Sequence, residues 1–175
     1  LIHYGGYLAT GLSADPVTAA KSFISTNKAL FRLSDQGVAN LQLLNDSPMV
    51  GSDGHAVLFR QTFGGLAATQ DGLITVGVVD GKVAYVSSSA AGDGSAPAAP
   101  TLTAQAAWTL AAANVGHPLS IVDLSTGKDI NGWRTFSANG LTGGFQRVRL
   151  TALPTPTQGV RPAYEAIVLD NQSNG

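Results

Sequence analysis

The sequence predicts an α+β protein in which a helix packs on an antiparallel sheet, and this order occurs twice along the chain. Residues 16–31 carry apolar side chains at helical spacing, and three alternating segments follow them up to residue 89. A second helical segment after residue 101 is again followed by alternating segments. The two halves are separated by residues 90–100, a stretch of alanine, glycine, proline, serine and aspartate.

The first half begins with an arm, residues 1–14, that we expect to be extended. Asp15 suits the N-cap of a helix, and Pro16 suits the first helical position, where its missing N–H costs nothing. The apolar spacing that follows predicts an amphipathic helix over residues 16–31, which ends before Gly37. The residues at this spacing are Ala19, Ala20, Phe23, Ile24, Leu30 and Phe31.

Residues 55–63, 72–79 and 82–89 are predicted strands of an antiparallel meander, preceded by a short alternating segment at 40–44. Asp80-Gly81 joins the last two strands, because an Asp-Gly pair supplies the positive φ angles of a type I′ turn. Gly64-Gly65 is interpreted as another β-turn. It does not open a helix, so it cannot direct helix N–H groups at a phosphate.

Small residues, glycine and proline bury too little apolar area to order themselves, so residues 90–100 are predicted to form a loop or linker. We therefore expect a first domain over residues 1–90, a linker over 91–101 and a second domain over 102–175.

The second domain is predicted to begin with a helix that Thr101 or Thr103 caps and that runs to about Asn114. Trp108 and Leu110 are its packing residues, and Gly116 is a C-cap candidate. Predicted strands follow at about 119–124, 132–138, 145–151 and 162–169, separated by turns that include Gly143-Gly144.

Composition excludes several partners. The 175 residues have a net charge of −1, and the ten basic residues are spread along the chain. Only Arg147 and Arg149 are close together, on one face of a predicted strand, whereas nucleic-acid binding commonly uses about six to ten phosphate contacts. No apolar run reaches about 18 residues, so no membrane-spanning helix is expected. The absence of cysteine excludes disulfides, thiolate zinc sites and cysteine nucleophiles.

Residues suited to catalysis are few. The three histidines, His3, His55 and His117, form no His-Glu-x-x-His motif, and the aspartates fall mostly in predicted turns. We therefore predict no metal site and no cofactor. The sequence has no Gly-x-Ser-x-Gly elbow, but a dispersed Ser–His–Asp site remains open because such triads are assembled in space.

The polar pair Arg60-Gln61 interrupts an otherwise apolar strand. In one interpretation, both side chains point to the solvent or to the sheet edge. In the other, one of them lies at a partner surface, where a guanidinium can hold a carboxylate.

Several blocks resemble the fungalysin/thermolysin propeptide (FTP) family followed by a PepSY-like region. The most specific is Phe59-Arg-Gln-Thr-Phe-Gly-Gly-Leu66, which is similar to the strand and turn of FTP domains. The helix at Asp15–Asn27 with Leu30–Leu33, and the hairpin Asp80-Gly81-Lys82-Val83, resemble two further parts of that domain. Thr101–Gly116 and Arg161–Leu169 resemble the helix and late strand of the PepSY-like part.

The resemblance implies two cystatin-like halves and no catalysis by this chain. Such a pro-region assists the folding of a secreted zinc metallopeptidase and inhibits it until cleavage. Its partner would be the cognate metallopeptidase catalytic domain, and neither nucleic acid nor membrane is implied. Arg60, Gln61, Phe63 and Gly64 are the candidate partner-contact or family-motif residues.

Two alternatives stay open. The chain could be a secreted binding or adhesion module of the same fold without a peptidase partner. It could also be an enzyme with the dispersed Ser, His and Asp site.

Overall fold

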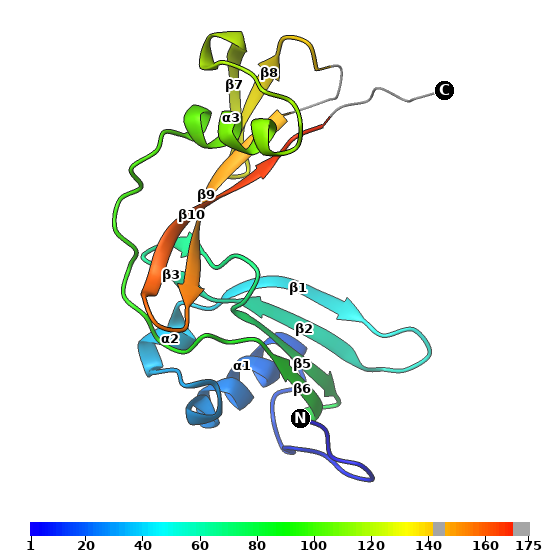
Figure 1. Ribbon diagram of the computed structural model, residues 1–175. Coiled ribbons are helices and arrows are strands. Elements are labelled where there is room, and N and C mark those ends of the chain that lie inside the picture. The colour runs from blue at the N-terminus through cyan, green and yellow to red at the C-terminus, as the bar shows by residue number, and fades with distance from the viewer. Residues whose placement is uncertain (142–145, 170–175) are drawn as a thin grey trace. The chain divides into compact units, whose positions relative to one another are not determined.

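The computed structural model describes residues 1–141 and 146–169, and its mixture of helices and antiparallel sheets confirms the predicted α+β class. The chain forms two compact units (Figure 1). One consists of Leu1–Pro97 and Ala152–Arg161, and the other of Ala98–Thr151 and Pro162–Gly175. The predicted boundaries placed residues 152–161 in the second domain, whereas here they belong to the first unit.

The first helix, α1 (Pro16–Thr26), begins where the sequence predicts. The Asp15 carboxylate accepts a hydrogen bond from the N–H of Thr18 at 2.8 Å. The helix ends earlier than predicted and gives way to a 3-10 turn, η1 (Lys28–Phe31). The prediction was wrong here because the spacing of apolar residues does not distinguish an α-helix from a 3-10 helix. Phe31 is buried in the 3-10 turn too.

A short helix that the sequence did not predict, α2 (Asp35–Ala39), follows a left-handed residue, Arg32, with φ of 56°. The Ser34 hydroxyl caps α2 by accepting from the N–H of Gly37 at 3.1 Å. Gly37, expected to separate elements, lies inside this helix, and a Cβ there would overlap the Asp93 carboxylate. Because Gly37 has no side chain, the Asp93 carboxylate can lie close to the backbone of α2.

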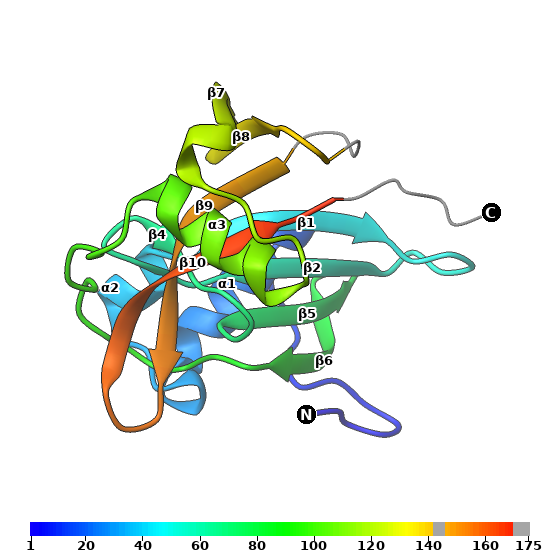
Figure 2. The ribbon, with the colours of Figure 1, turned by 45° about the horizontal axis from the view of Figure 1, so that its top comes forward.

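The main sheet of the first unit has the strand order β1-β2-β5-β6, with every neighbouring pair antiparallel. Figure 2 shows these strands side by side. Their bounds are Gln42–Pro48 for β1, His55–Arg60 for β2, Leu73–Val79 for β5 and Lys82–Ser88 for β6. Asp80 and Gly81 both have positive φ, at 46° and 65°, which confirms the predicted hairpin turn.

The strand predicted over residues 55–63 is interrupted at Gln61, so that β2 is followed by β3 (Thr62–Phe63). β3 pairs with β4 (Leu66–Ala67) through the turn at Gly64 and Gly65, whose φ angles are 58° and 83°. The predicted β-turn at these glycines is therefore confirmed.

The core of the first unit lies between α1 and one face of the main sheet. Phe23 and Ile24 of the helix pack with Phe59, Ile74 and other buried strand residues. Residues 1–12 line the outer edge of β6. The N–H of Leu8 donates to the carbonyl of Val83 at 2.7 Å, and the N–H of Leu12 donates to that of Gly81 at 2.9 Å. β1 forms the opposite edge of the sheet.

The helix of the second unit, α3 (Ala104–Asn114), is capped by the hydroxyl of Thr103. It ends at Val115 and Gly116, and the φ of 90° at Gly116 confirms the predicted C-cap glycine. The predicted strand at 119–124 is wrong, because a 3-10 turn, η2 (Ile121–Asp123), lies within it. The Asp123 carboxylate accepts from the N–H of Ser120 and stabilises this turn instead.

The second sheet has the antiparallel order β10-β9-β8-β7. β7 lies later than predicted, and β9 and β10 are longer than predicted. The predicted turn at Gly143-Gly144, together with residue 145 of a predicted strand, lies outside the described residues. The bounds are Leu124–Ile130 for β7, Trp133–Ala138 for β8, Gln146–Thr155 for β9 and Gly159–Ile167 for β10.

The core of the second unit forms where α3 covers one face of this sheet (Figure 2). Trp108 is fully buried beside Phe136 and Val148, and its indole N–H donates to the carbonyl of Ile167 at 3.0 Å. Leu110 was expected to pack with Trp108 but is 60% exposed. Residues two apart point to different sides of a helix, so only one of the two can face the sheet. Within the described residues, no helix has the length and apolar character that crossing a membrane requires.

Candidate functional site

Gln61, one of the predicted motif residues, is a buried contact inside the first unit. Its side chain is 3% exposed. The amide Nε2 donates to the carbonyl of Gly92 at 2.9 Å, and Oε1 accepts from the N–H of Ala91 at 2.8 Å. Neither the solvent-facing nor the partner-facing interpretation holds for this side chain. Instead, it binds the backbone of the segment that follows β6.

That segment, residues 89–96, is called the strap below. It has no helix or strand, as predicted for this part of the linker, but it is held at several points. The N–H of Asp93 donates to the carbonyl of Arg32 at 3.0 Å, and the Asp93 carboxylate accepts from the N–H of Ser34 at 2.7 Å. The Arg32 guanidinium donates to the carbonyl of Ala90 at 3.3 Å. Polar contacts thus hold a segment that lacks the apolar residues to do so.

Gly64 meets the far end of the strap. A Cβ at Gly64 would overlap the methyl group of Ala96, whereas a Cβ at Gly65 would meet nothing within 4 Å. Gly64 therefore meets two requirements. It adopts the positive φ of the turn, and it leaves room for Ala96 of the strap. Arg60, at the end of β2, is partly exposed, and its Nε is buried without a hydrogen-bond partner.

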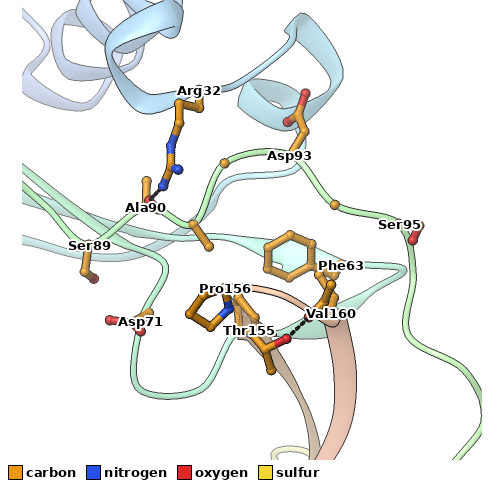
Figure 3. Close-up of a pocket in the computed structure, with 15 residues that line it drawn as sticks. Arg32, Phe63, Asp71, Ser89, Ala90, Asp93, Ser95, Thr155, Pro156 and Val160 are labelled. Carbon is orange, nitrogen blue, oxygen red and sulfur yellow. Dashed lines mark hydrogen bonds between the residues drawn. The ribbon is translucent and has the colours of Figure 1, made fainter.

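Phe63 lies at the centre of a pocket of about 620 Å³ within the first unit. Its ring is 4% exposed and packs with Val160, Ala152 and neighbouring apolar residues. Figure 3 shows the ring between the strap and the turn that joins β9 to β10. The remaining lining includes Pro154 and Pro156, with Arg32, Asp71 and Asp93 as charged groups.

The lining of this pocket combines apolar and polar groups. Of its charged groups, the Asp93 carboxylate already accepts a hydrogen bond from the backbone N–H of Ser34. The Arg32 guanidinium donates to a carbonyl of the strap. Phe63 and the two prolines present apolar surface. The structure thus brings Gln61, Phe63 and Gly64 together around the strap. Most of the strap was predicted as loop or linker, and none of it as part of a site.

His3 and His55, the histidines of the first unit, do not line this pocket. His55 Nδ1 lies 2.8 Å from Asp46 Oδ1 across the β1–β2 pair, and His3 Nδ1 lies 3.1 Å from the carbonyl of Tyr7. Among residues 1–141 and 146–169, no group of three or more His, Cys, Asp or Glu side chains is placed to hold a metal ion. In the same residues, no serine hydroxyl is bonded to His55. The dispersed Ser–His–Asp site stays a prediction.

A scan against protein-family models found no match for this chain, and neither did a search of curated proteins. The resemblance to FTP and PepSY-like pro-regions therefore stays a prediction. It depends on the residues quoted for it.

Proposed function

We propose that this chain is a non-catalytic pro-region of the FTP type followed by a PepSY-like part. It acts as intramolecular chaperone and inhibitor of a secreted zinc metallopeptidase and is cleaved from it. The two units are then the two cystatin-like halves of this pro-region. In support, each unit packs a helix on one face of an antiparallel sheet, and the motif residues Gln61 and Gly64 organise the strap.

The observation that carries this proposal is the edge strand β1. One edge of the main sheet, at β6, is lined by residues 1–12, whereas β1 forms the other edge. β1 presents two exposed apolar side chains, Leu43 and Leu44, the first of them 44% exposed. An exposed edge strand with apolar side chains can take up a strand of a partner by β-augmentation.

The usable part of this edge is short. A register shift lies between Leu43 and Asn45, and Pro48 at the end of β1 has no N–H to donate. Pairing is therefore expected around residues 42–44. A short pairing segment suits a restraint that is released once the chain is cleaved.

The chaperone activity follows from the same binding. A peptidase domain rich in non-local contacts folds slowly. A partner that binds the folded state and not the unfolded state stabilises the folded state by mass action. Inhibition follows if the bound strand occupies or closes the substrate cleft.

The test mixes the purified chain with the catalytic domain of a secreted zinc metallopeptidase of the thermolysin type. We expect residual activity to fall as the chain is added and the yield of refolded enzyme to rise. Leu43→Asp places a charge on the edge and should weaken inhibition about tenfold or more, because burying an unpaired charge at an interface is costly.

Leu30→Asp is the matched control, since Leu30 is also exposed, at 59%, but lies on η1. It should inhibit as the wild type does. Unchanged peptidase activity at saturating chain, for enzymes with widely different sequences, would contradict the proposal.

A second candidate function is a secreted binding or adhesion module without a peptidase partner. It is favoured by the exposed apolar side chains of the second unit, on and beside a helix without charged residues. They are Leu110, Val115, Ile121 and Val122. Binding of a partner that requires these residues, with no effect on any peptidase, would favour the module.

A further inference from the structure

On the outer face of the second sheet, two guanidinium groups lie over the same aromatic ring. Arg149 lies 4.4 Å and Arg147 lies 4.9 Å from the ring centre of Trp133. The register of β8 and β9, in which Thr135 pairs with Arg147, brings Trp133 beside Arg149. The prediction that the two arginines share one strand face is therefore confirmed, and the ring holds both of them.

The two guanidinium groups differ in their partners. Arg149 is paired with Glu165, at 2.7 Å from Nε and 2.6 Å from Nη2. Arg147 is exposed and, within the described residues, has no carboxylate partner. Among the described residues, Arg147, Arg149 and Glu165 together give this face one net positive charge, with the two cations close together. A further carboxylate at Arg147 would relieve the repulsion between the two arginines.

The stack also prepares Arg147 for binding. A guanidinium held on an aromatic ring keeps its planar donors oriented, so less conformational entropy is lost when a planar carboxylate binds. Arg149, which lies over the same ring, already binds a carboxylate, that of Glu165.

We infer that this face, formed by Trp133, Arg147 and Arg149, binds an acidic peptide segment of a partner protein, with a carboxylate of that segment on Arg147. A nucleic acid fits less well. It would need about six to ten cationic contacts, whereas Arg134 of this unit is already paired with Asp129 at 2.7 Å. The inference depends on this sheet face alone and not on a peptidase partner.

The experiment titrates the full chain with a short peptide of alternating glutamate and threonine, at low salt. The fluorescence of Trp133 reports binding, and Trp133→Phe shows that the signal comes from this ring, because Trp108 is buried in the core. The matching peptide with glutamine in place of glutamate should not bind. Binding of the glutamate peptide should weaken as salt is raised.

Arg147→Gln should weaken binding about five- to tenfold, between the effects typical of exposed and of hydrogen-bonded ion pairs. Arg161→Gln is the matched control. Arg161 is also exposed, lies in the first unit and donates to Gln158. It removes the same charge and should leave binding unchanged. Arg147→Lys and Arg161→Lys form a second pair for the case that the glutamine variant does not fold. Both keep the charge, but only the first loses the stacked planar group, so only the first should bind more weakly.

Three results would overturn the inference. The first is no binding of the glutamate peptide to the wild type. The second is equal binding of the glutamine peptide, or equal weakening by the substitutions at Arg147 and Arg161. The third is an oligonucleotide that binds this face where the glutamate peptide does not.

Discussion

Two buried glutamines, Gln61 and Gln146, use their side-chain amides in the same way. Gln61 bonds to Ala91 and Gly92, and Gln146 bonds to both backbone groups of Leu169, at 2.6 and 2.8 Å. An amide carries a donor and an acceptor, as a peptide group does. Gln61 thereby adds two hydrogen bonds to those that already hold the strap, and Gln146 fixes the backbone at Leu169.

Replacing Gln61 by leucine is predicted to destabilise the protein by about 2–3 kcal/mol. The leucine side chain has a similar size, but it leaves the N–H of Ala91 and the carbonyl of Gly92 without their partner. Urea unfolding measures the free energy, and limited proteolysis should cut within the strap more readily in the variant.

Gln36→Leu is the control for this substitution. Gln36 is exposed and donates only to Asn40 on the same short helix and its cap. Its replacement should change stability by less than about 0.5 kcal/mol. Equal effects of the two substitutions would show that burial of Gln61 has no energetic role.

Asp15 makes part of the stability depend on pH. Hydrogen bonds from the side chain and from the backbone N–H of Thr18 lower the pKa of Asp15. Because the folded-state pKa is below the unfolded value of about 3.9, the ionised cap stabilises the fold above that value. This contribution is lost as the pH falls through the folded-state pKa.

Asp15→Asn keeps a capping oxygen and cannot ionise. We predict that the wild type has the higher melting temperature near neutral pH and that the difference shrinks as the pH falls from about 6 to about 3. Thermal unfolding followed by circular dichroism measures it. A difference that stays constant over this range would mean that the charge of the cap contributes nothing.

At the scale of elements, the two glycines of the β3–β4 hairpin are needed for different reasons. Gly64 and Gly65 both have positive φ, but only Gly64 is approached by the strap. Gly65→Ala is predicted to cost about 1 kcal/mol, the backbone term alone. Gly64→Ala should cost about 1–3 kcal/mol more, because its methyl group overlaps Ala96. Urea unfolding of both variants tests this order, and equal losses would mean that the strap does not lie against Gly64.

The features that depend on residues adjacent in the sequence, namely caps and turns, could be predicted. The caps at Asp15 and Gly116 and the turn at Asp80 depend on local backbone chemistry, and the structure has them where the sequence placed them. The break of the first helix and the 3-10 turn η2 were not predictable from apolar spacing, which both kinds of helix satisfy.

The candidate site was predictable only in part. Gln61, Phe63 and Gly64 stood out because the polar pair Arg60-Gln61 interrupts an apolar strand and a glycine turn follows that strand, in a block that resembles FTP domains. Their shared contact, the strap, lies about thirty residues further along the chain, and Gln61 reaches it through backbone groups of alanine and glycine. Backbone groups leave no trace in a sequence, so this contact needed the structure.

At the scale of the whole molecule, the protein has a separate hydrophobic core in each unit. Phe59 belongs to the core around α1, and Phe136 belongs to the core around Trp108. Both tryptophans, Trp108 and Trp133, are in the second unit. Tryptophan fluorescence therefore reports unfolding of the second unit, whereas far-ultraviolet circular dichroism reports both.

Phe59→Ala is predicted to remove about 3–5 kcal/mol from the first unit, because it leaves a cavity at a side chain that is 1% exposed. The dichroism transition should then acquire an earlier phase, while the tryptophan transition keeps its midpoint. Phe136→Ala is the matched change in the other core and should shift the tryptophan transition instead. If both signals shift together in Phe59→Ala, the two cores unfold as one cooperative unit, and a ligand bound to one of them stabilises the whole chain.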